Sequence, residues 1–142
     1  MPVVGFNFTK LLAEKTGEIN QETRAKSDLK VVDVSQEKLP VGDAEEILKF
    51  TFSFTVEYGN AGLSTMEGFL LYMEEPKKIK EIIKEWKEHK RVEADLMTQV
   101  LNNILFKTTV KALNLTQDVN LPPHFKLPYV KKQQAEEQTE EN

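Results

Sequence analysis

The sequence predicts an α+β fold in which a four-stranded antiparallel sheet is followed by two helices packed on one of its faces. Two observations predict this class. In the first half of the chain, apolar residues recur at every second position, which is the period of a half-buried strand. In the second half they recur at every third or fourth position, which is the period of an amphipathic helix. At 142 residues the chain has room for one domain and little more.

The first two strands are predicted on either side of a polar stretch. Apolar and polar residues alternate over residues 4–9, which predicts the first strand. A loop is expected over residues 16–26, where most side chains are polar, and a short strand over Leu29 to Val34, where β-branched residues are frequent. Residues 36–43, which include a proline and a glycine, are expected to connect this strand to the next.

The third strand has the clearest pattern, because five apolar residues share one of its faces: Phe50, Phe52, Phe54, Val56 and Tyr58. Gly59 and Asn60 follow it, and both tolerate the positive φ of a tight hairpin turn. A fourth strand is predicted from about Gly62 to Met73. Its apolar residues occupy both parities, with Leu63, Phe69, Leu71 and Met73 on one and Met66, Leu70 and Tyr72 on the other. Its last half is therefore predicted to be apolar on both faces.

Two helices are predicted after the strands. Pro76 suits the first turn of a helix, where the missing N–H has no intrahelical partner to lose. The apolar stripe of this helix consists of Ile79, Ile82, Ile83 and Trp86. Its other face is rich in Lys and Glu, and two i,i+4 ion pairs are expected there: Lys77–Glu81 and Lys84–Glu88. A longer helix is predicted from about Val92 to Leu113, with a broad stripe that covers the sheet: Leu96, Val100 and Ile104 beside Met97, Leu101 and Leu105.

The helical period is lost after Asn114. The segment from Val119 to Pro128 contains three prolines, which remove hydrogen-bond donors and fix the backbone, so it is not expected to be helical. From Lys131 to Asn142 the chain has four glutamates, three glutamines and no aliphatic residue larger than alanine. This acidic tail is predicted to be disordered, which leaves a single domain over residues 1–130.

Composition excludes several classes of function. The net charge of −4 argues against nucleic-acid binding and against an anionic membrane surface, because both need clustered Lys and Arg. The chain has no cysteine, so disulfides, thiolate zinc sites and cysteine nucleophiles are excluded. Its first residues lack the basic and apolar regions of a signal peptide, and no apolar run approaches the ~20 residues that cross a bilayer. A cytoplasmic protein without membrane insertion is expected.

No residue pattern predicts an enzyme or a cofactor. His89 lies among charged residues and is expected at a solvated helix end; neither it nor His124 has a second histidine at zinc-binding spacing. Glu67 interrupts an apolar strand, and a buried carboxylate there could act as a general base. A half-exposed strand position explains it better. We expect no catalytic site and no metal site.

Two segments in the C-terminal third resemble the signature of the SecB family of protein-export chaperones. Asn103-Ile104-Leu105-Phe106 lies in the long helix, and Asn120-Leu121-Pro122-Pro123-His124-Phe125 follows after a gap. The family has an Asn-Ile-Leu-Phe-Pro type motif followed by a segment like Leu-x-Leu-x-Pro-x-Asn-Phe, and a similar order of four strands and then helices. This chain departs from the pattern at Lys107 and His124, where the family usually has proline and asparagine. Residues 76–90 also lengthen the link between sheet and long helix, and Pro128 puts the family's C-terminal helix in doubt.

The resemblance implies an ATP-independent chaperone that keeps unfolded preproteins competent for export. Its implied partners are unfolded polypeptides, an export motor or translocase component, and further copies of itself in a homo-oligomer, a dimer or a tetramer. The sequence adds a physical basis, since a sheet that is apolar on both faces leaves apolar surface for binding. We predict a client groove formed by aromatic and apolar residues: Phe50, Phe52, Phe54, Tyr58, Phe69, Tyr72, Leu121 and Phe125.

Three alternatives stay open from the sequence. The residues predicted for the groove are equally well explained as core. The domain could instead bind a small acyl or aromatic ligand, as a thioesterase-like enzyme does, in which case a positioned Asp or Glu is expected. It could also be an adaptor subunit whose exposed apolar surface serves only in assembly.

Overall fold

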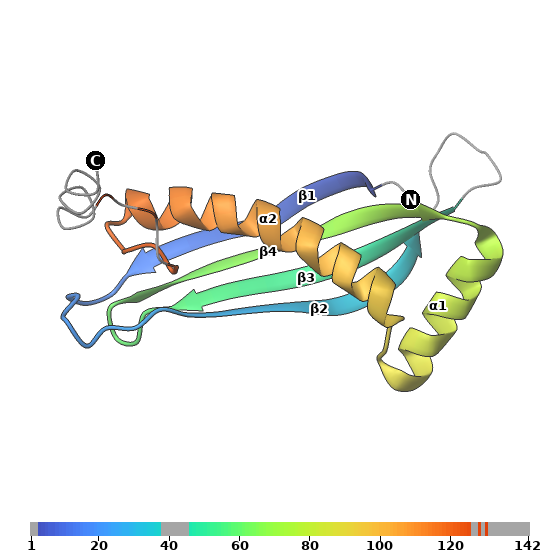
Figure 1. Cartoon of the computed structure of the whole chain (residues 1–142), viewed down its shortest axis with the longest axis horizontal. Coiled ribbons are helices and arrows are strands. Elements are labelled where there is room, and N and C mark those ends of the chain that lie inside the picture. The colour runs from blue at the N-terminus through green and yellow to red at the C-terminus, as the bar shows by residue number, and fades with distance from the viewer. Residues whose placement is uncertain (1–2, 38–45, 126–127, 129, 131–142) are drawn as a thin grey trace, which may run out of the picture.

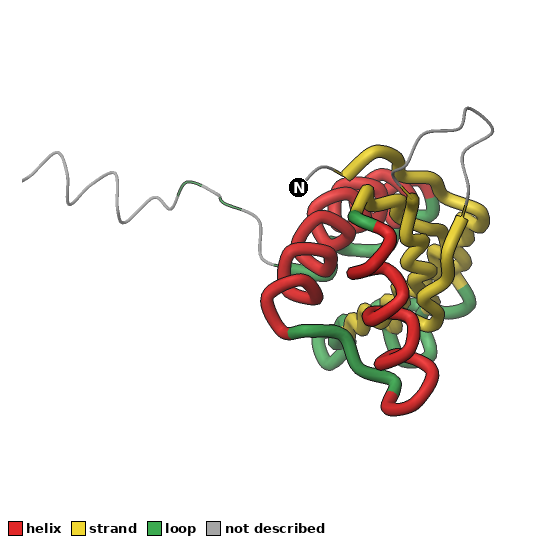
Figure 2. Tube along the Cα trace, turned by 90° about the vertical axis from the view of Figure 1, so that its right-hand side faces the viewer, coloured by secondary structure: helices red, strands yellow, loops and turns green. Residues whose placement is uncertain are grey.

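The computed structural model describes residues 3–37, 46–125, 128 and 130 of the chain (Figure 1). It confirms the predicted fold class: four antiparallel strands form one sheet, and two helices lie on one of its faces. Figure 2 shows the helices as a layer beside the strands. The strand order in the sheet is β1-β4-β3-β2, so β1 and β2 are the edge strands. No helix among the described residues has the length and apolar character needed to span a membrane.

The edge strands are longer than predicted. They are β1 (Val3–Lys15) and β2 (Lys26–Glu37), and the central strands are β3 (Glu46–Glu57) and β4 (Gly62–Glu74). Each edge strand pairs along nearly the whole length of its central neighbour, and this pairing recruits polar residues that have no strand pattern of their own. The predicted loop over residues 16–26 is confirmed except that Lys26 begins β2. Of the predicted connection over residues 36–43, the first two residues belong to β2 and the rest lies outside the described residues.

The β3–β4 hairpin forms where the sequence predicts it. Gly59 has φ of 58°, a left-handed conformation that costs glycine little. The Tyr58 N–H donates to the Gly62 carbonyl at 2.9 Å and closes the turn. The β1–β2 loop is joined to the same turn, because the Thr16 N–H donates to the Ala61 carbonyl at 2.9 Å. Both loops therefore lie at one end of the sheet.

The two faces of the sheet are covered by the helices to different extents. The apolar row of β3, from Phe50 to Tyr58, is buried beneath the helices together with Met66, Leu70 and Tyr72 of β4. The other parity of β4 faces away from the helices and is half-buried: Leu63, Thr65, Glu67, Phe69, Leu71 and Met73. This alternation confirms that the last half of β4 is apolar on both faces.

Helix α1 (Pro76–His89) packs against β2 and β3. It buries Ile79 and Trp86 and ends at Lys90, whose φ of 53° is left-handed and whose N–H donates to the Trp86 carbonyl at 2.8 Å. The two predicted ion pairs are wrong. Between described residues, the ion pair formed is Lys49–Glu37 (3.3 Å), and the His89 Nδ1 atom lies 3.5 Å from the Glu85 carboxylate. Exposed lysines gain little from such pairs, because the loss of side-chain entropy offsets the weak Coulomb attraction in water.

Helix α2 (Ala94–Asp118) crosses the sheet with a row of inward residues at every fourth position: Val100, Ile104, Thr108, Ala112 and Thr116. The two threonine hydroxyls donate to the Ile104 and Ala112 carbonyls, so they are buried without an unsatisfied donor. Leu105, which was predicted to cover the sheet, is 44% exposed. Residues spaced by four lie on nearly the same side of a helix, so the inward row winds only slowly around α2. Leu105 therefore lies at the edge of the contact between α2 and the sheet.

The prediction that helical structure ends near residue 114 is also wrong, because α2 continues to Asp118. The extra turn places Thr116 in the core, where one more contact with the sheet favours helix over loop. The helix then ends in a Schellman motif: the Leu121 N–H donates to the Thr116 carbonyl at 2.8 Å and the Asn120 N–H to the Gln117 carbonyl at 3.2 Å. Asn120 takes the left-handed position with φ of 59°.

Candidate functional site

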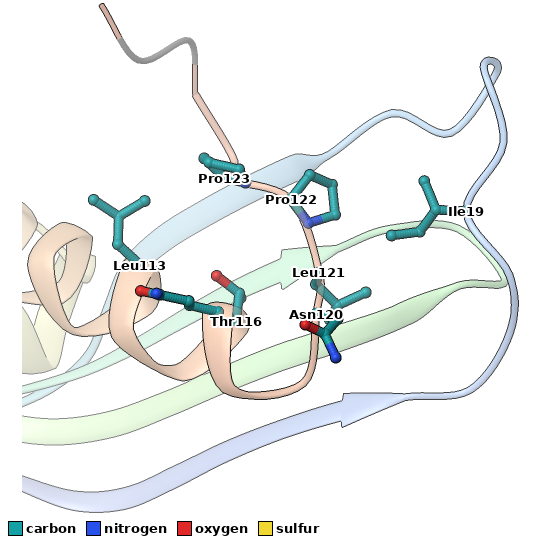
Figure 3. Close-up of a pocket in the computed structure, with 8 residues that line it drawn as sticks. Ile19, Leu113, Thr116, Asn120, Leu121, Pro122 and Pro123 are labelled. Carbon is teal, nitrogen blue, oxygen red and sulfur yellow. The ribbon is translucent and has the colours of Figure 1, made fainter.

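An apolar cleft of about 670 Å³ lies at the C-terminal end of α2 (Figure 3). It is bounded by the end of α2, the chain that follows it, and the β1–β2 loop, from which Ile19 faces Leu121. The lining residues are Ile19, Leu113, Thr116, Gln117, Asn120, Leu121, Pro122 and Pro123. None of these side chains carries a charge, so the cleft offers apolar contact with a few amide and hydroxyl groups.

The chain after α2 is held over the sheet by three contacts. The Schellman motif reverses its direction, and Leu121 then enters the core, where it is 4% exposed. The hydroxyl of Tyr58 donates to the Pro122 carbonyl at 2.5 Å, which ties the segment to the end of β3. Burial raises the pKa of Tyr58, and a hydrogen bond with Thr116 opposes this shift. The tyrosine therefore stays a donor, and Pro122 and Pro123 form a fixed wall of the cleft.

Beyond this wall, His124 joins an aromatic cluster. Its ring meets that of Phe54 edge-to-face at 5.8 Å and that of Phe125 at 4.9 Å between centroids. Burial lowers the pKa of His124, and its Nδ1 atom is buried without a hydrogen-bond partner among the described residues. The neutral imidazole thus serves as an apolar cover for Phe54, while Phe125 is 41% exposed at the surface.

The outer surface of α2 carries an apolar stripe that leads into the cleft. Phe106 and Val110 are 73% and 50% exposed. Leu113, which lines the cleft, lies three residues after Val110 and therefore on the same side of the helix. We call these three residues the outer stripe. A phenylalanine that is largely exposed in mid-helix contributes little to the core beneath α2. The outer stripe adjoins the cleft at Leu113, and none of the residues of either is charged.

The residues predicted for a client groove are divided between core and surface. Phe50, Phe52 and Tyr72 lie in one core cluster and Phe54, Tyr58 and Leu121 in a second, all at most 4% exposed. Phe69 lies on the uncovered face of the sheet, where the Lys49 ammonium is 4.5 Å from its ring centroid. Phe125 lies beside the cleft. A client role for the buried six stays a prediction, since a client reaches them only if α2 or the chain after it moves.

Sequence reasoning missed the outer stripe and Ile19. The signal for Phe106 was available, because it stands in the motif that carries the SecB resemblance. Its exposure was not evident, since apolar residues occur on several sides of α2 and the inward side is chosen by contact with the sheet.

The His, Asp and Glu side chains were the candidates for a catalytic or metal-binding role. The described residues include no group of three His, Asp or Glu side chains placed to hold a metal ion. Glu67 lies on the uncovered face of the sheet, half-buried, opposite Lys10 of β1 and Ser53 of β3. It is on the opposite side of the sheet from the cleft. His89 is exposed at the end of α1, as predicted.

No protein-family model matches the chain, and no curated protein matches it. Among solved structures, one that is similar is a SecB-like chaperone of Mycobacterium tuberculosis in complex with a ChAD peptide from an antitoxin. The alignment covers 92% of this chain and 91% of that chain, with 11% sequence identity and a TM-score of 0.48. At this identity and TM-score the likeness concerns the arrangement of strands and helices and does not extend to residues, ligands or partners.

Proposed function

We propose that this protein is an ATP-independent chaperone that binds apolar segments of unfolded polypeptides on the outer stripe and in the cleft. The observation that carries this proposal is the exposed apolar outer stripe, which adjoins the uncharged lining of the cleft at Leu113. Exposed apolar surface of this kind, rimmed by polar residues, is typical of interaction sites. Unfolded chains differ from folded partners in presenting apolar residues along an extended backbone, which suits a long surface of low specificity.

The physical basis of binding is apolar burial, at about 25 cal/mol per Å² before the cost of ordering the client is subtracted. Asn120 and Gln117 line the cleft and offer amide groups to a client backbone, which has no other partner once water is displaced. The rigid prolines need not be ordered on binding, which favours affinity. Such a site discriminates apolar from charged segments and reads little further sequence.

The two segments that resemble SecB contribute to this surface. Phe106, from the first segment, begins the outer stripe, and the second segment forms the cleft wall from Asn120 to Pro123. In keeping with that resemblance, we propose that the clients are preproteins held competent for export, that an export motor or translocase component receives them, and that the protein acts in the cytoplasm without catalysing a reaction.

The experiment is suppression of aggregation of a chemically denatured client at stoichiometric protein. Replacing Phe106 and Val110 together with serine is expected to weaken client binding several-fold while leaving the melting temperature nearly unchanged, since neither side chain is in the core. The matched control replaces Asn102 and Asn114, two exposed polar residues of α2, with serine and is expected to bind clients normally. Full protection by the Phe106→Ser/Val110→Ser variant would remove the outer stripe from the site.

Two further measurements test the apolar character of the site. Client affinity is expected to persist at high salt, because screening weakens charge contacts and leaves apolar contacts nearly intact. Phe125→Ser is expected to weaken binding, provided circular dichroism shows a folded protein. A protein that binds a short acyl ligand in the cleft but fails to protect any denatured client would instead support the small-ligand alternative.

We also propose a homo-oligomer, a dimer or a tetramer, assembled through the uncovered face of the sheet. That face carries the half-buried residues Leu63, Phe69, Leu71 and Met73, whereas the outer stripe must stay free for clients. Light scattering is expected to give a multiple of 16.3 kDa, and Leu71→Lys is expected to lower it. A monomer at tens of micromolar would contradict the assembly without bearing on the client surface.

A further inference from the structure

One flank of α1 carries three lysines without ion-pair partners. Lys80, Lys84 and Lys87 follow one another at spacings of four and three residues, and all are exposed. None of them forms an ion pair with a described residue. They border a cavity of about 320 Å³ between α1 and β2, together with Gln36, Ile83 and Glu88. We call Lys80, Lys84 and Lys87 the lysine flank.

The opposite flank of α1 has the reverse charge. There a cavity of about 280 Å³ lies between α1 and α2, and its charged lining is mostly acidic: Glu74, Glu81, Glu93 and Asp95 with Lys78. Helix α1 therefore separates an acidic cleft from a basic one. The lysine flank borders the cavity that includes a residue of β2, an edge strand of the sheet, and its lysines do not line the acidic cleft.

Strand β2 supplies a second element of the site. It is an edge strand, and within the described part of the chain no strand pairs with its outer side. An edge strand of this kind can accept a further strand along its outer side. The cavity includes Gln36, near the C-terminal end of β2, and Ile83 adds an apolar contact at the base of the lysine flank.

We propose that the lysine flank and the outer edge of β2 form a docking surface for an extended acidic segment of a partner polypeptide. Lys80 and Lys84 are about 6 Å apart along the helix axis, and Lys84 and Lys87 about 4.5 Å. Alternate residues of a strand are spaced by about 6.6 Å, so acidic side chains at every second position match the spacing of Lys80 and Lys84, and the long side chain of Lys87 spans the remaining difference. The backbone of the same segment pairs with β2, and its intervening apolar side chains contact Ile83.

A polypeptide fits this site better than a nucleic acid does. An edge strand such as β2 pairs with another peptide backbone through N–H donors and C=O acceptors, whereas a phosphate chain offers acceptors only. Glu88 borders the same cavity and the whole chain carries a net charge of −4, which opposes a polyanion of high charge density. The surface is also separate from the client cleft, because α1 and the C-terminal end of α2 lie at opposite ends of the sheet (Figure 1).

The test measures fluorescence anisotropy of a labelled twelve-residue probe in which Glu and Val alternate, titrated with the full chain at low salt. Replacing all three lysines of the lysine flank with glutamate is expected to weaken binding about tenfold or more, since three exposed charge contacts are lost and reversed. The matched control, Lys10→Glu/Lys15→Glu/Arg24→Glu, changes the net charge equally at exposed sites on β1 and the β1–β2 loop and is expected to bind the probe as the parent does. A second variant, in which the three lysines of the lysine flank are replaced with glutamine, removes the positive charges without adding negative ones and so tests the site even if the glutamate variant fails to fold.

Five outcomes decide the proposal. Loss of binding in the flank variants, together with loss at high salt, supports it. Loss of binding by a probe N-methylated at alternate backbone nitrogens supports pairing with β2, and unchanged binding of that probe overturns the pairing. Equal weakening in the control variant, or tight binding of an oligonucleotide and none of the probe, overturns the site. Client protection is expected to be normal in every flank variant, so failure here is distinguishable from failure of the proposed chaperone function.

Discussion

The two helices cover the same face of the sheet, yet their outer surfaces differ in kind. Helix α1 buries Ile79 and Trp86 and presents lysines and glutamates to solvent. Helix α2 buries Val100 and Ile104 and presents Phe106 and, one turn later, Val110. The inner residues of both helices are explained by the core they cover. The outer residues make no contribution to that core, so the contrast between a charged and an apolar outer surface points to two different binding tasks.

The largest expected effect compares an inward with an outward residue of α2. Ile104→Ala is expected to lower the free energy of unfolding by about 2–5 kcal/mol, because Ile104 is fully buried and its loss leaves a cavity. Phe106→Ala is expected to change it by less than about 0.5 kcal/mol, because an exposed side chain loses little on truncation. Urea denaturation measures both. A cost for Phe106→Ala above 2 kcal/mol would mean that the outer stripe is covered in the folded protein.

The ends of the two helices provide a matched pair of backbone tests. Lys90 directly follows α1, and Asn120 lies in the turn that follows α2. Both are non-glycine residues with left-handed φ. Lys90→Gly is expected to stabilise the protein by about 1 kcal/mol, because glycine removes the steric cost of that conformation. Asn120→Gly is expected to add only a few tenths of a kcal/mol, because asparagine already tolerates it. Thermal unfolding distinguishes the two, and a larger gain at Asn120 would contradict this explanation of the α2 terminus.

The anchoring of the cleft wall is tested at Tyr58. Tyr58→Phe removes the hydrogen bond to the Pro122 carbonyl and is expected to cost about 0.5–1.5 kcal/mol of stability. Client binding is expected to fall as well, because the wall from Asn120 to Pro123 loses its tie to β3. The effect is expected at the apolar end of the molecule, where Tyr58 holds the wall. A variant that loses stability but binds clients as the parent does would separate the wall from the site.

The smallest expected effect is a pH dependence that arises from His124. Its pKa in the folded protein lies below the ordinary value of 6.5, so below pH 6.5 the unfolded chain binds a proton more readily than the folded one. Stability is therefore expected to fall as pH drops from 6.5 toward 5, and to show no contribution from His124 above that range. His124→Phe is expected to flatten this part of the profile of melting temperature against pH. An unchanged profile would show that His124 is not buried in its neutral form.

The type and order of the strands and helices follow from local patterns in the sequence. The alternation around Phe52 and the stripe from Ile79 to Trp86 depend only on which residues a strand or helix brings to one face, and both were predicted correctly. The hairpin at Gly59 follows from local backbone preference. The two SecB-like segments were also visible in the sequence, and with them Phe106 and the wall of the cleft.

The length of the edge strands, the end of α2 and the side of α2 that faces the sheet depend on contacts between elements that are distant in the sequence. Residues of β1 beyond Phe8 are strand because β4 pairs with them, and no local pattern requires it. Apolar residues occur on several sides of α2, so periodicity does not identify the inward side; contact with the sheet selects the row through Ile104 and leaves Phe106 outside. The cleft depends on the same choice, because it forms only where the reversed chain meets Ile19 of a loop about a hundred residues earlier in the sequence.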